Sequence, residues 1–285
     1  MAGVEIRKLT ERDIDAALQL TDLEGWGYNR ADWLRLLALA PGGCFGAQRD
    51  EELVGVLSTT SYGKAAYLGS VIVQNKLRGQ GIGAAMMRAA LDHLDRNDVE
   101  TVRLNAYLHV VPFYEKLGFR KEHPNMRWEG ALHNASWSGI HPLREKDLEG
   151  VIATDAAYFG SPRGILIRHL AQEFPATFLV AEERGTIRGY IVGNASGEGC
   201  EIGPWIVEEG NPRVARELLE ALLHSAGAGT YAFTAPGPNT DVHSLAREAG
   251  LQESVRYRTL RMVRGADAYG GRPEGIWALG GLDKG

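Results

Sequence analysis

A glycine-rich turn in the first half of the chain has the residue types that bind an anionic group. Glycine occupies positions 79, 81 and 83, directly after Arg78 and before a run of residues with helical periodicity. Glycine leaves the amide N–H groups at a helix start open to a phosphate, without a Cβ in the way. The turn therefore predicts a phosphate cradle, although a tight strand-to-helix turn that binds nothing is an equally good interpretation of these glycines alone.

The spacing of the glycines argues against two common nucleotide-binding motifs. The dinucleotide fingerprint requires GxGxxG, whereas these glycines alternate with single residues. A Walker loop ends in GK[ST], which residues 77–84 lack. A nucleotide-binding enzyme of another fold is therefore the weaker alternative.

Two aromatic residues among glycines form a second candidate site. Trp26 and Tyr28 flank Gly27 and follow Gly25, which predicts a loop. Aromatic rings in such a loop can wall a pocket or stack on a cation. Packing against the core is the competing explanation, and the sequence does not separate the two.

Composition narrows the class of protein. The chain has 285 residues, of which 44% are hydrophobic, enough for one large domain or two ordinary ones. Its 31 Lys and Arg against 36 Asp and Glu, without a long basic run, argue against a nucleic-acid partner. No stretch reaches the roughly 18 continuous apolar residues of a membrane span, so we expect a cytoplasmic protein without membrane contact. Cys44 and Cys200 lack CxxC spacing, so we expect neither a disulfide framework nor a zinc site.

The chain repeats itself at a nearly constant interval. The matching pairs at an offset of 134 are residues 9–15 with 143–149, Gly55 with Gly189, and residues 68–73 with 202–207. Residues 117–119 match residues 249–251 at an offset of 132. A repeated offset indicates two copies of one domain. We place the boundary between Trp128 and Gly139, which divides the chain into residues 1–130 and 131–285.

Strand and helix signals alternate in each copy. In the first copy, β-like runs cover residues 43–48, 53–62, 66–73 and 101–106, and a helical pattern covers residues 83–94. The second copy has β-like runs at residues 177–182 and 187–194. This mixture predicts an α/β or α+β fold with a mixed central sheet in each half.

Residues 71–83 and 111–119 together resemble the GNAT family of N-acetyltransferases. The first segment carries the family's [QR]xxGx[GA] signature, and the second carries its YEKLGF-type sequence. The second half of the chain follows the family's strand order but has lost the signature, because residues 208–213, with two acids, replace the cradle. The resemblance implies two tandem GNAT-like domains, each with a mixed, mostly antiparallel central sheet flanked by helices. Residues 1–130 would be the catalytic domain, and residues 131–285 a degenerate copy with an acceptor-side or structural role.

The resemblance also implies that acetyl-CoA is the acyl donor and that no metal takes part. In the family, the strand before the signature parts from the next strand and pairs with the pantetheine arm, while the cradle holds the diphosphate. The residues carried over are Val71, Ile72 and Val73 for the arm, and Arg78, Gly79, Gln80, Gly81, Ile82 and Gly83 for the diphosphate. Asn105 could bond the same arm or cap the turn that follows it.

Tyr114 matches the family's general acid. The resemblance implies that an amine attacks the acetyl carbon directly in a ternary complex and that this phenol protonates the departing thiolate. Packing of the short helix on the sheet is the alternative role for the ring. Glu24 lies where family members place acceptor-binding residues and could bind or deprotonate an ammonium, although a solvated surface acid is the commoner case. His109 could serve as a base near neutral pH, but a lone histidine is usually a satisfied polar residue.

The acceptor is expected to be a primary amine of a small molecule. Its expected binding residues are Trp26 and Tyr28 in the first copy, and Tyr158, Phe159 and Arg163 in the second. The second copy resembles a carboxy-terminal domain found in a subgroup of bacterial GNAT proteins. We expect it to close over the first domain's cleft, with Arg163 available for a carboxylate, or else to give structural support alone. We expect a monomer or homodimer, and a non-catalytic acyl-CoA or metabolite sensor is the alternative function.

Overall fold

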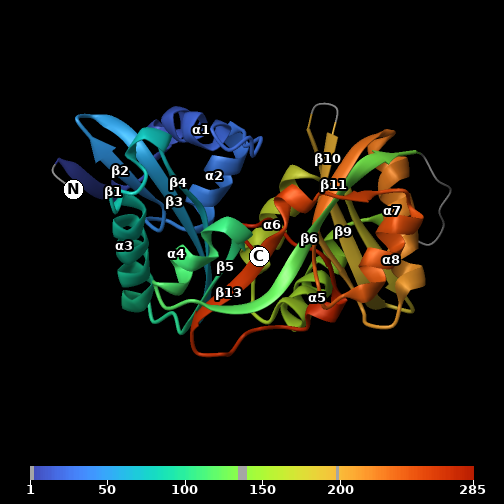
Figure 1. Cartoon of the computed structure of the whole chain (residues 1–285). Helices are drawn as coiled ribbons and strands as arrows, with labels where there is room; N and C mark the ends of the chain where they lie inside the picture. Colours follow the sequence, from blue (N-terminus) through green and yellow to red (C-terminus); the bar gives the residue numbers. More distant parts are fainter. Residues whose placement is uncertain (1–2, 134–139, 197–198) are drawn as a thin grey trace.

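The two halves of the chain share a single large sheet. In the computed structural model, which describes residues 3–133, 140–196 and 199–285, one 14-stranded sheet runs through the molecule with helices on both faces (Figure 1). Residues 134–139 of the predicted domain boundary lie outside the described residues. The fold is a mixed α/β fold, as the order of strand and helix signals predicts.

The amino-terminal half contains six strands and four α-helices among its described residues. The strands are β1 (Val4–Lys8), β2 (Phe45–Arg49), β3 (Glu52–Tyr62), β4 (Ala65–Val73), β5 (Thr101–Tyr107) and β6 (Arg120–Leu132). The α-helices are α1 (Ile14–Asp22), α2 (Arg30–Leu39), α3 (Ile82–Arg96) and α4 (Val111–Glu115). Helices α3 and α4 pack on one face of the sheet, and α1 and α2 pack on the other.

The carboxy-terminal half repeats this order. Its strands are β7 (Ile140–Pro142), β8 (Phe178–Glu183), β9 (Thr186–Ser196), β10 (Gly199–Val207), β11 (Gly229–Pro236), β12 (Gln252–Glu253), β13 (Thr259–Gly265) and β14 (Ile276–Ala278). Its α-helices are α5 (Leu148–Phe159), α6 (Gly164–Glu173), α7 (Pro212–Ala226) and α8 (Thr240–Glu248). No helix in the described part of the chain has both the length and the apolar character that crossing a membrane requires.

The duplication extends to individual contacts at the predicted offset of 134. The Thr59 hydroxyl donates to the Gly43 carbonyl at 2.9 Å. At the two corresponding positions the residue types are exchanged, and the Thr177 hydroxyl donates to the Gly193 carbonyl at 2.5 Å. The same two positions are therefore hydrogen-bonded in both halves, although the threonine donor occupies the first position in one half and the second position in the other. This agreement indicates that the two halves share the same backbone arrangement here.

Each half donates a strand to the sheet of the other. Strand β13, from the second half, lies between β5 and β6 and pairs antiparallel with both. Strand β6 continues past the predicted boundary at residue 130 and pairs with β11 from Asn125 to Leu132. Figure 1 shows β6, in green, running from one half into the other and β13, in red, within the amino-terminal half. The sequence predicts a sheet in each half, and this exchange joins the two into one.

A buried ionic cluster holds the exchanged strands in register. The Glu122 carboxylate, on β6, accepts from Arg103 of β5 at 3.1 Å and from Arg261 of β13 at 2.7 Å. Both arginine side chains are at most 5% exposed. Burial by itself raises the pKa of Glu122, but the hydrogen bonds from Arg261 and Arg103 outweigh it, so this pKa lies below its ordinary value of 4.5.

We predict that Glu122→Gln lowers the free energy of unfolding by about 3 kcal/mol at pH 7, because two buried guanidinium groups lose their counter-charge. Since the folded-state pKa is depressed, this stabilisation is present above pH 4.5 and is lost as the pH falls through the folded-state pKa. The difference between wild type and variant in urea unfolding should therefore shrink at acidic pH.

The control is Glu115→Gln, which removes an exposed ion pair with Lys121 of 3.1 Å. We expect it to cost less than about 1 kcal/mol, because solvent screens an exposed pair. Equal losses in the two variants would contradict the role given to Glu122.

Candidate active site

The parallel strands β4 and β5 part in the middle of the first half. Their pairing covers only Ala65 to Leu68 against Thr101 to Leu104. On its other edge β5 pairs with β13 over its whole length, and in the described part of the chain no strand pairs with residues 69–73 of β4 on the side that faces β5. The β3–β4 register shifts at the same place, where Ser70 has a positive φ of 51°. The strand 70–73 therefore presents a free backbone edge, as the predicted site requires.

The glycine-rich turn that follows β4 is open. Gly79 and Gly81 have positive φ angles of 76° and 83°, which glycine adopts without strain. A Cβ added at Gly79 would meet no atom within 4 Å. Within the described chain, no backbone N–H group of residues 79–84 donates a hydrogen bond. Six free amides at the amino end of α3 are suited to an anion such as a diphosphate.

Arg78 connects this turn to the loop before α2. Its Nε donates to the Val73 carbonyl at 3.0 Å, and its Nη2 donates to the Glu24 carboxylate. The two side chains remain partly exposed, at 49% for Arg78 and 33% for Glu24. Glu24, predicted to handle the acceptor amine, is thus engaged at the cradle, and a bound phosphate would compete with it for Arg78.

Tyr114 lies on α4, packed against the sheet. Its ring makes edge contacts with Phe113 and Phe119, at centroid distances of 5.0 and 6.1 Å, and the residue is 8% exposed. Among the residues that the structure describes, none accepts or donates a hydrogen bond at its hydroxyl. Burial raises the pKa of Tyr114 well above its ordinary value of 10, so the phenol keeps its proton at neutral pH.

Trp26 and Tyr28 belong to a row of aromatic rings. Trp26 contacts Tyr28 at 6.0 Å and Tyr107 at 6.4 Å between ring centroids, and Tyr107 contacts Tyr257 of the second half at 6.4 Å. His109, which is exposed, stacks on Tyr107 at 6.1 Å. The row joins the loop before α2, the end of β5 and the second half of the molecule.

Residues 279–285, which carry no motif, lie at this site between the two halves. Asn105, predicted to bond the coenzyme arm, donates to the Leu282 carbonyl at 2.9 Å, and Tyr62 donates to the Lys284 carbonyl at 3.0 Å. The Asp283 carboxylate accepts from the Tyr28 hydroxyl at 2.9 Å, and Tyr28 also contacts the Ser70 hydroxyl at 3.3 Å. Figure 1 shows the end of the chain at the centre of the molecule. Local sequence gives no sign of this placement, which depends on contacts between residues 177 to 255 positions apart.

Arg163 holds this segment in place. Its side chain is fully buried, its Nε and Nη2 bond Asp155, and its Nη1 donates to the Gly285 carbonyl at 2.5 Å. Because the side chain is buried and each of its three nitrogens bonds a residue of the second half, Arg163 is not exposed to an acceptor carboxylate in this structure. Phe159 packs under its guanidinium at 3.9 Å and stacks on Tyr67 at 5.4 Å.

Tyr158 and Phe159 are part of the core between the halves. Both are buried, at 5% and 3% exposure, in a cluster that also contains Tyr62 and Tyr67 of the first half. Tyr158 accepts at its hydroxyl from the Glu209 N–H at 3.2 Å. Their contacts therefore join the two halves.

The gap between the parted strands β4 and β5 is the opening of the first half. In the second half, another strand fills the corresponding gap between β10 and β11. Strands β10 and β11 pair in parallel only from Gly199 to Glu201, and β14 then pairs with β10 at Trp205 and Ile206. At the start of α7, the Glu208 carboxylate bonds Arg188 at 2.8 Å and Asn211 at 3.2 Å. Among the described residues, the second half therefore has no free strand edge at this place, and a carboxylate stands in the turn before α7.

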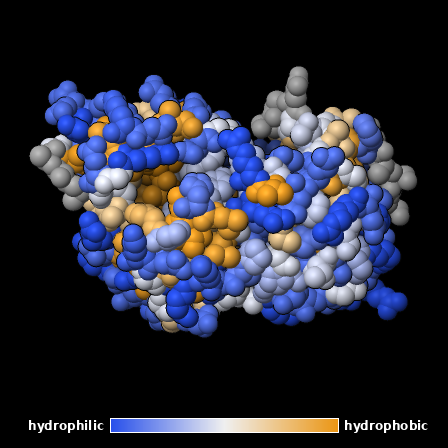
Figure 2. Space-filling model, in the orientation of Figure 1, coloured by the Kyte–Doolittle hydropathy of each residue, from blue (hydrophilic) through white to orange (hydrophobic). Residues whose placement is uncertain are grey.

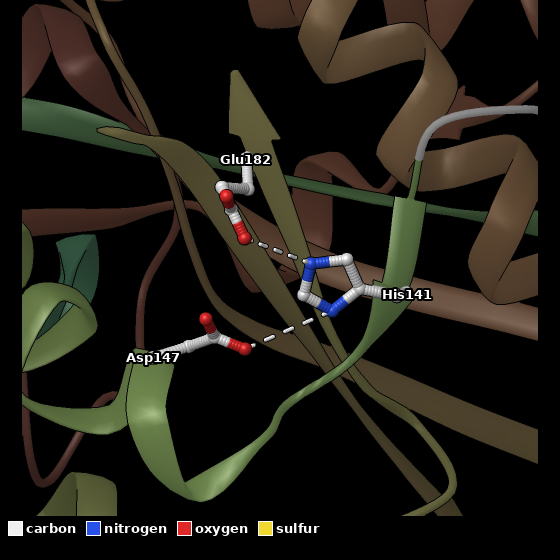
Figure 3. A group of neighbouring side chains, drawn as sticks. All are labelled: His141, Asp147 and Glu182. Carbon is white, nitrogen blue, oxygen red and sulfur yellow. Dashed lines mark ion pairs between the residues drawn. The ribbon is translucent and has the colours of Figure 1, made fainter. Parts of the chain in front are cut away.

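A group of His141, Asp147 and Glu182 lies in the second half, away from this opening (Figure 3). His141 is 3.8 Å from Asp147 and 3.6 Å from Glu182. The offset of 134 relates these positions to Arg7, Asp13 and Gln48, where Arg7 bonds both partners. The group is the counterpart of a contact that joins the first two strands of each half.

Both cysteines lie in the interior of the protein. Cys44 and Cys200 are free and buried, and burial raises the pKa of each thiol to about 12, which makes both poor nucleophiles.

Figure 2 shows hydrophobic surface gathered on the amino-terminal half, around the place of α4, while the other half is mostly hydrophilic in this view.

Known proteins resemble the chain in both sequence and structure. A Bacillus subtilis (strain 168) protein, "Uncharacterized N-acetyltransferase YitH", is 25% identical over 261 residues, which cover 87% of this chain and 88% of the relative. A putative acetyltransferase from Pyrococcus horikoshii has a TM-score of 0.84 at 24% identity, over 100% of this chain and 97% of its own. A GCN5-related N-acetyltransferase from Sphaerobacter thermophilus has a TM-score of 0.68 at 18% identity, over 93% and 98% of the two chains. These structures share the fold over nearly their whole length.

Two family models match in succession along the chain. Both describe an acetyltransferase (GNAT) domain, one over residues 38–134 and the other over residues 151–278. With the parted strands, the open cradle of the first half and the duplicated framework, these matches show that the chain belongs to the GNAT family of acetyltransferases, with two family domains in tandem.

Proposed function

We propose that the first half, residues 1–130, transfers an acetyl group from acetyl-CoA to the primary amine of a small molecule, by direct attack in a ternary complex. The observation that carries this proposal is the combination of a free β4 edge with an unplugged cradle in the first half alone. Membership of the GNAT family supports acyl transfer in general, and the acceptor and the order of events are our inference.

The residues around the opening fit this donor. Acetyl-CoA supplies an acetyl thioester on a long arm that ends in a diphosphate. The backbone of Val71, Ile72 and Val73 offers the arm a free strand edge, and Asn105 lies on the facing strand. Arg78 and the amides of residues 79–83 would hold the diphosphate, because they combine a guanidinium with free N–H donors.

The second half, residues 131–285, binds no coenzyme in this proposal and builds the acceptor side. Strand β14 already satisfies the β10 edge that would otherwise receive an arm. Phe159 and Arg163 act on the acceptor through residues 279–285, because both contact Gly285, and Tyr158 lies in the same core cluster as Phe159. Tyr28 contacts the same segment from the first half, and Trp26 packs against Tyr28.

We predict that Tyr114→Phe lowers kcat by about 100-fold or more, since a positioned general acid contributes on that order. Stability should change little, because the hydroxyl lacks a hydrogen-bond partner among the described residues. Coenzyme release from acetyl-CoA with a panel of amines measures the effect. The control Tyr231→Phe removes a hydroxyl from the second half and should keep the wild-type kcat. Binding of acetyl-CoA without turnover on any amine would favour a sensor instead.

The Arg78–Glu24 pair predicts opposite effects of two substitutions. Arg78→Ala should raise the KM for acetyl-CoA by about tenfold, because a charge-assisted bond to phosphate is lost. Glu24→Gln should lower the same KM, because it frees Arg78 for the phosphate, and should leave kcat unchanged. A large fall of kcat in Glu24→Gln would restore this residue to the role of acceptor base.

Calorimetric titration with coenzyme A tests which half binds it, and we predict one site per chain. Gly79 and Gly210 precede α3 and α7, have φ angles of 76° and 77°, and have open space around them. Gly79→Ala should weaken binding by about tenfold or more, because it places a methyl group in the cradle and strains the turn. Gly210→Ala carries the same strain and should leave binding unchanged. Two sites per chain, or equal losses in both variants, would refute this division of roles.

A further inference from the structure

A buried carboxylate of the second half meets β4 where that strand leaves β5. Successive residues of β4 point to opposite faces, so Ala66 and Leu68 pack with α3, whereas Tyr67 packs with the second half. Gly69 follows Tyr67 on the second face, and a Cβ there would lie 2.2 Å from the Cβ of Asp283. Asp283 thus lies next to the gap between β4 and β5, on the face of the sheet opposite helix α3.

The Asp283 carboxylate already binds a primary ammonium group. Its side chain is 3% exposed, and its Oδ1 accepts from Lys284 Nζ at 2.6 Å. Its Oδ2 accepts from the Tyr28 hydroxyl at 2.9 Å. A buried carboxylate needs a counter-charge, and Lys284 supplies the one that the structure shows.

The surroundings of this carboxylate suit an organic cation. Tyr28, which bonds Asp283, begins the aromatic row that continues through Trp26 and Tyr107 to Tyr257. Aromatic faces attract ammonium groups and pack on hydrocarbon. Burial and the nearby Asp283 charge raise the pKa of Tyr28 well above 10, so this phenol remains a donor to the carboxylate.

We propose that Asp283 is the residue that binds the ammonium group of the acceptor, and that Lys284 occupies this carboxylate until the acceptor displaces it. The inference rests on the proposed function and specifies its acceptor side. It assigns the acceptor to small primary amines that are positively charged at neutral pH. It also gives the second half a direct contact with substrate, through Asp283 rather than Arg163.

Two substitutions should shift the acceptor KM in opposite directions. The amine of the panel that wild type acetylates best serves as the probe. Asp283→Asn keeps the size of the side chain and removes its charge, so the KM for this amine should rise by about tenfold or more. Lys284→Met removes the resident ammonium and should lower the KM, because a larger fraction of sites is then free. In both variants the KM for acetyl-CoA should match that of wild type.

The matched controls are Glu182→Gln and Lys146→Met, which break a carboxylate–lysine pair of 3.3 Å in the second half away from the opening. Neither should change the KM for the amine. An unchanged amine KM in Asp283→Asn, or a raised one in Lys284→Met, would overturn the proposal. If either single variant unfolds at the assay temperature, the neutral double variant Asp283→Asn/Lys284→Met must show the raised KM instead.

A binding measurement separates this inference from the proposed function. Calorimetric titration with butylammonium chloride, without acetyl-CoA, should show binding to wild type and tighter binding to Lys284→Met. It should show none to Asp283→Asn, and butan-1-ol should bind to none of the three. If no amine is acetylated, the proposed function fails, and this titration still judges Asp283. Binding of butylammonium that is equal in wild type and Asp283→Asn would refute the assignment of Asp283 alone.

Discussion

Where two parallel strands separate, their backbone N–H and C=O groups lose their hydrogen-bond partners. The two halves of this protein satisfy these groups in different ways. In the second half, β14 enters between the parted strands and pairs with β10, so the backbone edge is satisfied internally. In the first half, no described strand takes that place beside β4. The open edge borders an open cradle, and this pairing of features makes the first half the candidate for ligand binding.

The same stretch of chain closes one opening and lines the other. After β14 fills the gap in the second half, residues 279–285 continue to the underside of the β4–β5 gap. The Leu279 N–H bonds Thr234 at 2.9 Å as the chain leaves, and Arg163 fixes its far end. The second domain thus contributes residues 279–285 to the underside of the opening in the first domain.

Exchange of strands makes the two halves one structural unit. Strands β6 and β13 cross between them, and the buried Arg103–Glu122–Arg261 cluster joins the crossing strands. On the outer side, Arg35 of α2 bonds Glu173 of α6 at 2.8 Å between Nε and Oε2. Such contacts fix how residues 279–285 lie under the opening, so the geometry of the site depends on both halves.

The sequence by itself determined the features that depend on local pattern or on repetition. The glycine spacing predicted the open turn, the constant offset predicted the duplication, and alternating strand and helix signals predicted the mixed fold. Only the tertiary structure decided how these parts meet. The strand exchange, the burial of Tyr158, Phe159 and Arg163, the pairing of Glu24 with Arg78, and the placement of Asp283 beside Gly69 all join residues far apart in the chain. Neither hydrophobic periodicity nor a sequence motif predicts these long-range contacts, because they are stabilised by packing and charge pairing that exist only in the folded molecule.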